Sequence, residues 1–112
     1  MNDYEKMQRA DLRLRVLQVL ASVPGYRANE SMVRQQLAER YAHALSQDAL
    51  RGELAWLNEQ GLLAYQGADI VLASLTQRGQ DCAAGLTQIP GVKRPGPDEM
   101  LMAAGIGLLR QL

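Results

Sequence analysis

The chain has 112 residues, of which 47% are apolar, and it carries 12 basic side chains, 12 acidic side chains and one cysteine. A chain of this length folds as one domain and can bury roughly two-thirds of its unfolded surface without disulfide bonds. The single cysteine excludes a disulfide framework and a zinc site built from several cysteines. The balanced charge excludes a broad positive field that attracts nucleic acid of any sequence.

The distribution of apolar residues bears on the location of the protein. No apolar run approaches the roughly 20 residues that a membrane span needs. The first residues are charged and helical in character, unlike a signal peptide. We therefore expect a cytoplasmic protein that binds no membrane.

Two helices are predicted in the first part of the chain. Leucine and valine recur at spacings of three and four residues between positions 3 and 22, a pattern typical of an amphipathic helix with a broad buried face. Pro24 and Gly25 end this segment. Asn29 is a favourable N-cap residue for a second helix, which runs to about Tyr41.

A third helix is predicted over residues 46–60. Ser46 suits its N-cap position, and Gly61 suits the C′ position that follows its end. Three leucines at helical spacing form a narrow seam that faces a core. These leucines are Leu50, Leu54 and Leu57.

A short hairpin and a fourth helix follow. The apolar runs 62–66 and 70–75 flank a tight turn, which predicts two antiparallel strands. An isolated hairpin is marginally stable, so this one must pack on the helices. Thr76 is the expected N-cap of a helix that ends at Gly85.

The composition changes after the fourth helix. Residues 87–97 hold three of the four prolines and predict an extended linker. Residues 98–112 predict a helix that is apolar all round and too short to span a bilayer. Such a helix must be buried, and we expect it to pack against a second copy of the chain; folding back onto its own domain is the alternative. The expected interface residues are Met100, Leu101, Ala104, Ile106, Leu108, Leu109 and Leu112.

This order of elements is that of a winged helix-turn-helix, an α+β fold that is mostly α-helical, here with a short two-stranded wing and an extra C-terminal helix. We expect a winged-helix domain at 1–86, a proline-rich linker at 87–97 and the C-terminal helix at 98–112. The helix at 46–60 would be the recognition helix. The fold alone does not decide the function, because winged helices also serve as protein-interaction modules.

Four motifs together resemble the small winged-helix proteins of Mu-like phages and prophages, a family described as ArsR-like. They are YRANES at 26–31, ELAWLxEQGL at 53–62, LTxxGxDxAAG at 75–85 and PGVKRP at 90–95, where x is any residue, and the resemblance covers roughly residues 10–97. It implies a phage-encoded DNA-binding protein in the cytoplasm of a bacterial host. The position of such genes near DNA-packaging genes implies packaging as another role. The metal-sensing cysteines of ArsR sensors are absent, because Cys82 is the single cysteine, so metal sensing is not expected.

The resemblance and the fold together predict a transcriptional regulator that binds DNA as a homodimer without a cofactor. Arg51 and Gln47 on the third helix are the candidates for contacts with base edges. The expected contacts with the DNA backbone come from Arg27, Arg34 and Ser46.

Other features favour an adaptor that binds another phage or host protein, for packaging or for taking over a host factor. The helix at 46–60 carries one base against three acids, a poor match to a groove walled by phosphates. The turn of the predicted wing contains no lysine or arginine. The small residues Ala49 and Gly52 lie beside Trp56 on the outer side of this helix, which suits a protein interface. Cover of Trp56 by the chain's own N-terminal arm or C-terminal tail is the equal alternative.

No catalytic arrangement is evident in the sequence. His43 is the single histidine and lies in the turn before the third helix, where a surface or capping role is expected. Cys82 has no obvious histidine partner and is expected to be a small buried residue. The glycines at 105 and 107 lack the third glycine of a phosphate-binding loop. We therefore expect no enzymatic activity, no metal and no cofactor.

Overall fold

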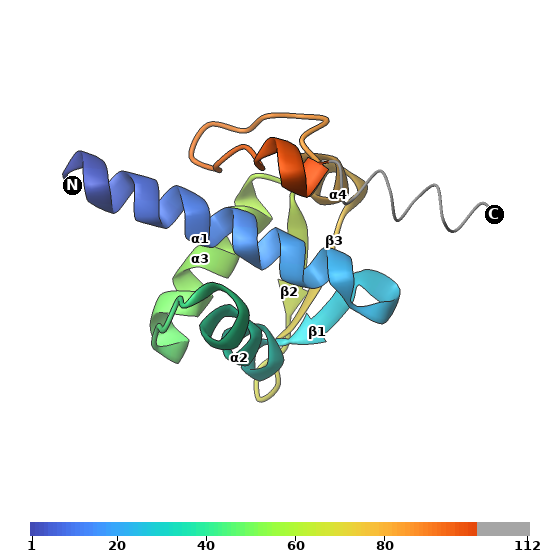
Figure 1. Ribbon diagram of the computed structural model, residues 1–112. Helices are drawn as coiled ribbons and strands as arrows, with labels where there is room; N and C mark the ends of the chain where they lie inside the picture. Colours follow the sequence, from blue (N-terminus) through green and yellow to red (C-terminus); the bar gives the residue numbers. More distant parts are fainter. Residues whose placement is uncertain (101–112) are drawn as a thin grey trace.

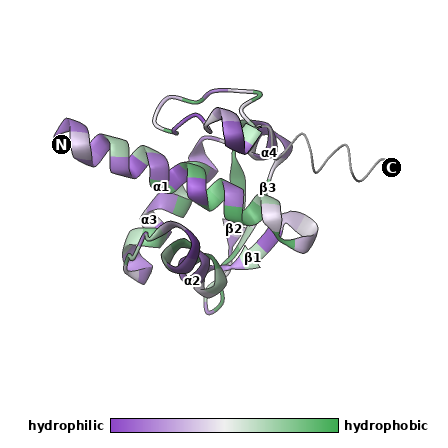
Figure 2. Ribbon diagram, in the orientation of Figure 1, coloured by the Kyte–Doolittle hydropathy of each residue, from purple (hydrophilic) through white to green (hydrophobic). Residues whose placement is uncertain are grey.

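A 20-residue helix, α1 (Asp3–Ser22), crosses the molecule in the computed structural model, which describes residues 1–100. The C-terminal half of α1 packs against the other helices and the sheet, whereas its N-terminal half extends beyond them (Figure 1). Its buried residues, at the expected apolar positions, are Leu14, Val16, Leu17, Val19 and Leu20. Hydrophobic residues gather where α1 crosses the sheet, and hydrophilic residues dominate α2 (Figure 2).

The helix-turn-helix consists of α2 (Glu30–Tyr41) and α3 (Gln47–Glu59). The predicted caps are confirmed: Asn29 accepts a hydrogen bond from the backbone N–H of Met32 at 2.8 Å, and Ser46 accepts one from Ala49 at 3.0 Å. The three leucines predicted to form the inner seam of α3 are fully buried. Side-chain oxygens at these caps satisfy backbone N–H groups that have no partner within the helix, so local sequence sets where each helix begins.

The sheet has three antiparallel strands, where the sequence predicted two, and the hairpin at residues 63–75 is its wing. The strands β1 (Arg27–Asn29), β2 (Leu63–Gln66) and β3 (Leu72–Leu75) lie in the order β1-β3-β2. The predicted hairpin is the β2–β3 pair, and β1 adds Ala28 opposite Ala73. A strand of three residues has too little alternation to be recognised in a sequence. The short helix η1 (Pro24–Tyr26) leads from α1 into β1.

The fourth helix, α4 (Gln77–Ala83), packs back on α1 and completes the winged helix-turn-helix fold. Thr76 caps it as predicted, accepting a hydrogen bond from the backbone N–H of Gly79 at 3.0 Å. Gly79 is required by close approach, because a Cβ atom there would lie 1.9 Å from the carbonyl oxygen of Leu62. The fold class expected from the sequence, mostly α-helical with a small antiparallel sheet, is confirmed.

Residues 87–96, which we call the strap, pack on the domain, whereas the sequence predicted an extended linker. Ile89 and Val92 are buried members of the hydrophobic core. The Val92 N–H donates to the Ile89 carbonyl at 3.0 Å, closing a turn with Pro90 second and Gly91 third at a φ of +92°. This turn brings both apolar side chains to the same side. The Lys93 N–H then donates to the Ala10 carbonyl of α1 at 3.1 Å.

The described chain ends in a single helical turn at residues 97–100. Met100 lies against Gly85 of the same chain, where an added Cβ atom would approach its Cε to 2.6 Å. For Met100, this contact agrees with the alternative prediction, in which the C-terminal helix folds back onto its own domain. The other expected interface residues, Leu101, Ala104, Ile106, Leu108, Leu109 and Leu112, lie outside the described residues. Among residues 1–100, no helix is both long and apolar enough to cross a membrane.

We expect Ile89→Ala to lower the free energy of unfolding by about 2–4 kcal/mol, because it empties a buried site in the core. Leu86→Ala is the matched control, since Leu86 is 79% exposed and lies just before the strap. Its effect should stay within about 0.5 kcal/mol of zero. Urea unfolding followed by circular dichroism measures both. Equal, small effects would mean that the strap is an unpacked linker.

Candidate functional site

The start of α3 and the adjoining side of α2 form the part of a helix-turn-helix that faces DNA in winged-helix regulators. Arg34 of α2 donates from Nε to the carbonyl oxygen of Leu45 at 2.9 Å, which holds its guanidinium beside the N-terminus of α3. An open groove of about 330 Å³ lies between α2 and this turn. Its lining residues are Ser31, Arg34, Gln35, Ala38, Ala44 and Leu45.

The five residues predicted to contact DNA fall into two groups. Arg27 on β1, Arg34 on α2 and the α3 cap Ser46 are on or near the surface at the helix-turn-helix. Gln47 and Arg51, predicted to read bases, instead donate hydrogen bonds within the protein. Both are bonded to the carboxylate of Glu30 in the first turn of α2.

Glu30 is a buried carboxylate in the first turn of α2, with only 5% of its surface exposed. Arg51 binds it through two hydrogen bonds, from Nε to Oε2 at 2.8 Å and from Nη2 to Oε1 at 2.6 Å. Gln47 Nε2 donates to Oε1 at 2.6 Å. The hydrogen bonds from Arg51 hold the pKa of Glu30 below its ordinary value, although burial alone would raise it. Glu30 is therefore charged and paired at neutral pH.

The outward side of α3 carries acidic and small residues. Asp48 and Glu59 are exposed, and a Cβ atom at Gly52 would meet open space. Glu53 is turned toward α1, where Arg13 Nε donates to it at 2.7 Å and Arg9 lies at 3.5 Å. The face is therefore less acidic than the count of charges in the sequence indicates.

The tip of the wing is apolar and not basic. Ile70 is 68% exposed, and Leu72 is also exposed. The connection from Gly67 to Val71 contains no lysine or arginine. A wing of this composition offers no cation for a phosphate contact.

Trp56 is half-buried under the strap, so one of the two alternatives left open by the sequence matches the structure. An added Cβ atom at Gly91 would lie 3.0 Å from two ring atoms of Trp56. The Arg13 guanidinium stacks 3.8 Å from the centroid of the ring, and its Nη1 donates to the Gly91 carbonyl at 3.1 Å. The chain's own C-terminal segment thus covers this side chain. The place of Ala49 and Gly52 in a protein interface stays a prediction, because the structure of a single chain does not test it.

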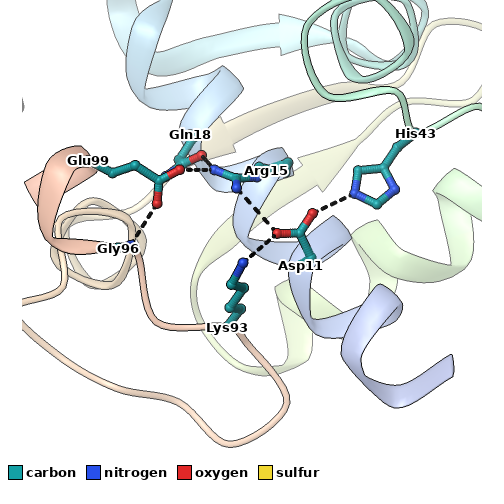
Figure 3. Close-up of polar contacts among 7 residues, drawn as sticks. All are labelled: Asp11, Arg15, Gln18, His43, Lys93, Gly96 and Glu99. Carbon is teal, nitrogen blue, oxygen red and sulfur yellow. Dashed lines mark hydrogen bonds and ion pairs between the residues drawn. The ribbon is translucent and has the colours of Figure 1, made fainter. Parts of the chain in front are cut away.

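A second polar cluster, centred on Asp11 of α1, joins three segments that are far apart in the sequence (Figure 3). Asp11 accepts contacts from His43 at 2.7 Å and from Lys93 and Arg15 at 3.3 Å each. Arg15 also pairs with Glu99, which in turn accepts a hydrogen bond from the Gly96 N–H at 2.8 Å. No motif in the sequence predicts this cluster, and the spacing of four between Asp11 and Arg15 is its only local signal.

Titration of these carboxylates depends on their partners. Burial raises the pKa of Asp11, but its contacts with His43, Arg15 and Lys93 outweigh burial and lower the pKa below its ordinary value. The pKa of Glu99 is lowered in the same way, by Arg15 and the Gly96 N–H against the effect of burial. Both carboxylates are therefore ionised in the folded protein over the neutral range.

His43 and Cys82, the two residues considered for catalysis, lie in surroundings that suit a structural role. His43 lies in the turn before α3, where its ring contacts Asp11. Cys82 is buried, and burial raises the pKa of its thiol, which makes it a poor nucleophile. Within residues 1–100, no group of three or more histidine, cysteine, aspartate or glutamate side chains is arranged to hold a metal ion.

Comparison with known proteins finds relatives in a phage and in a bacterium. The chain is 40% identical over 88 residues to the uncharacterized protein gp26 of Escherichia phage Mu, covering 78% of this chain and 90% of that protein. It is 36% identical over 99 residues to a protein of Haemophilus influenzae, covering 87% and 95%. No family model matches the chain.

Solved structures of winged-helix regulators share the fold. H. salinarum RosR superposes with a TM-score of 0.59 at 16% identity, covering 90% of this chain and 94% of that chain. Bacillus subtilis PadR, in complex with operator DNA, has a TM-score of 0.54 at 18% identity, covering 89% and 60%. At such low sequence identity, these structures show only that the chain shares their fold. They do not support the more specific ArsR-like assignment.

We expect the stability of the protein to fall in acid. A carboxylate whose pKa is lowered by folding stabilises the protein fully above its ordinary pKa and loses that contribution as the pH falls through the lowered value. Asp11, Glu30 and Glu99 all have lowered values, so the urea midpoint should be level near neutral pH and fall below pH 4.5, the ordinary value of a glutamate.

Asp11→Asn should lower the midpoint at pH 7 and make its acid dependence shallower, because one charged partner is removed. Asp69→Asn is the matched control at an exposed position in the wing, with no ion pair among residues 1–100. It should follow the wild-type midpoint at neutral pH. An unchanged acid dependence in Asp11→Asn would contradict a stabilising role for the cluster.

Proposed function

The chain belongs to the family of protein gp26 of phage Mu, and on that premise we propose that it is a phage-encoded winged-helix protein that binds DNA as a transcriptional regulator. The proposal is supported by the helix-turn-helix, which keeps its α3 N-terminus open, and by the fold shared with winged-helix regulators. We further propose that the protein acts in the bacterial cytoplasm, needs no cofactor and has no enzymatic activity.

One observation carries this proposal. The Arg34 guanidinium is held beside the first turn of α3 by its bond to the Leu45 carbonyl, and its remaining N–H groups, which have no partner among residues 1–100, can donate to a phosphate. A cation and a helix N-terminus at the same place form a favourable position for the DNA backbone. Arg27 on β1, three residues before α2, adds an exposed positive charge.

We propose that the regulator is a homodimer, because helix-turn-helix proteins that bind two half-sites on DNA do so as dimers. Its pairing element is the apolar segment after residue 97, in line with the division of the chain into a winged-helix domain, the strap and a C-terminal helix. The apolar composition of residues 101–112 supports this part of the proposal.

A protein–protein adaptor for packaging or for a host factor is the second candidate function. It is favoured by the exposed apolar side chain of Ile70 at the tip of a wing that lacks lysine and arginine. An apolar wing tip suits the core of a protein interface better than a phosphate backbone.

The DNA-binding proposal predicts that Arg34→Ala weakens binding to all sequences alike and reduces the slope of log affinity against log salt concentration by about 1. Fluorescence anisotropy with fragments of the phage genome at low salt measures both. Arg78→Ala is the matched control, because Arg78 Nε also donates to a backbone carbonyl, that of Gln60, at 3.0 Å, but from α4. Equal effects of the two variants, or no binding by the wild type, would overturn the proposal.

The adaptor alternative predicts that Ile70→Asp abolishes complex formation with a protein partner and leaves the urea midpoint of the isolated protein unchanged, because the side chain is exposed. Purified products of phage packaging genes are the partners to test, by light scattering of mixtures. DNA binding by wild type and Ile70→Asp with equal affinity, together with no complex in any mixture, would argue against the adaptor.

A further inference from the structure

We propose that Glu30 is a specificity-determining residue of this DNA-binding site. Its carboxylate takes the Nε–Nη2 edge of Arg51 and the side-chain amide of Gln47, the groups of α3 that are suited to read bases, so the protein contacts DNA through the sugar–phosphate backbone and does not read guanine. This inference rests on the proposed DNA-binding function and concerns what the bound protein recognises.

The composition of α3 limits which of its side chains can read bases. In the helix Gln47–Glu59, which the structure describes in full, Arg51 is the only cation. Gln47 is the only amide side chain in its first turn, the part of a recognition helix that enters the major groove. Ser46 is already bonded to the Ala49 N–H as the cap. Base reading by this helix therefore depends on Arg51 and Gln47.

Glu30 competes for the same hydrogen bonds that a base would take. Arginine binds guanine through two parallel hydrogen bonds to O6 and N7, and it binds a carboxylate through the same fork. Arg51 makes this fork with Glu30, at 2.8 Å and 2.6 Å. The donor atom of Gln47 that would serve adenine, its Nε2, is bonded to the same carboxylate at 2.6 Å.

The burial of Glu30 makes this competition one-sided. Moving Arg51 to a base would leave a carboxylate that is 5% exposed without its charged partner. Separating this pair leaves the carboxylate without its charged partner, which is unfavourable, whereas the contact with the base only replaces hydrogen bonds that the base already makes to water. The Arg51 side chain is nevertheless 39% exposed, so it lies at the surface and needs only to be released by Glu30 to reach a ligand.

The test compares wild type with Glu30→Gln on paired DNA duplexes. One duplex contains guanine and the other contains 7-deazaguanine, which lacks the N7 acceptor. Wild type should bind both with equal affinity by fluorescence anisotropy. Glu30→Gln, which removes the charge that holds Arg51, should bind the guanine duplex about tenfold more tightly than the 7-deazaguanine duplex.

A double variant identifies the reader. Adding Arg51→Ala to Glu30→Gln should abolish the preference for guanine, because Arg51 is the group released. If the Glu30–Arg51 pair has a structural role only, Glu30→Gln will lower the urea midpoint and show no preference between the duplexes, which would overturn the inference. If the Glu30→Gln protein fails to fold, the measurement on the wild type still tests the inference. Weaker binding of the wild type to the 7-deazaguanine duplex than to the guanine duplex would overturn it.

Failure of this inference is distinguishable from failure of the proposed function. If wild type binds DNA with the expected effect of Arg34→Ala but Glu30→Gln gains no preference, only the role of Glu30 is refuted. If wild type does not bind DNA, the proposed function is refuted, and with it the backbone contact assigned to the wild type, even if Glu30→Gln binds guanine DNA. Absence of binding by both refutes both.

Discussion

The pairing of one buried carboxylate determines how the helix-turn-helix is assembled. The Glu30 N–H donates to the Val71 carbonyl at 2.9 Å, and its side chain accepts hydrogen bonds from Arg51 and Gln47 of α3. A charge in this position must keep its partners, because burial without them costs far more than any surface contact returns. The start of α2, the first half of α3 and the wing, at Val71, are therefore held together at a single residue.

A second set of contacts makes the C-terminal strap part of the domain. Trp56 lies between the strap and α3, under Gly91 and the guanidinium of Arg13. The ion pairs around Asp11 connect the same strap to the middle of α1 and to the turn that precedes α3. The strap, α1 and the turn before α3 are therefore held together by contacts between segments that are far apart in the sequence.

The charges of this fold are arranged differently from those of a strongly basic DNA-binding domain. The cation of α3 is committed to Glu30, and Arg13 is committed to Glu53 and the strap. The exposed cations at the helix-turn-helix, Arg27 and Arg34, suit backbone contacts, which add affinity without sequence preference. Such an arrangement suits weak binding to DNA of any sequence better than tight binding to one operator. It also suits the second candidate function, a protein–protein adaptor.

The amino-acid sequence by itself determined the helices, their caps, the β2–β3 hairpin and the winged-helix class, because these depend on residues within a few positions of one another. The Asn29, Ser46 and Thr76 caps are examples. Only the tertiary structure decided the partners of the candidate site. Gln47 meets Glu30 across 17 positions, and Arg13 meets Gly91 across 78. An arginine or glutamine on a helix can face DNA or a buried acid with the same local spacing, and the choice is made by the packing of segments that are distant in the chain.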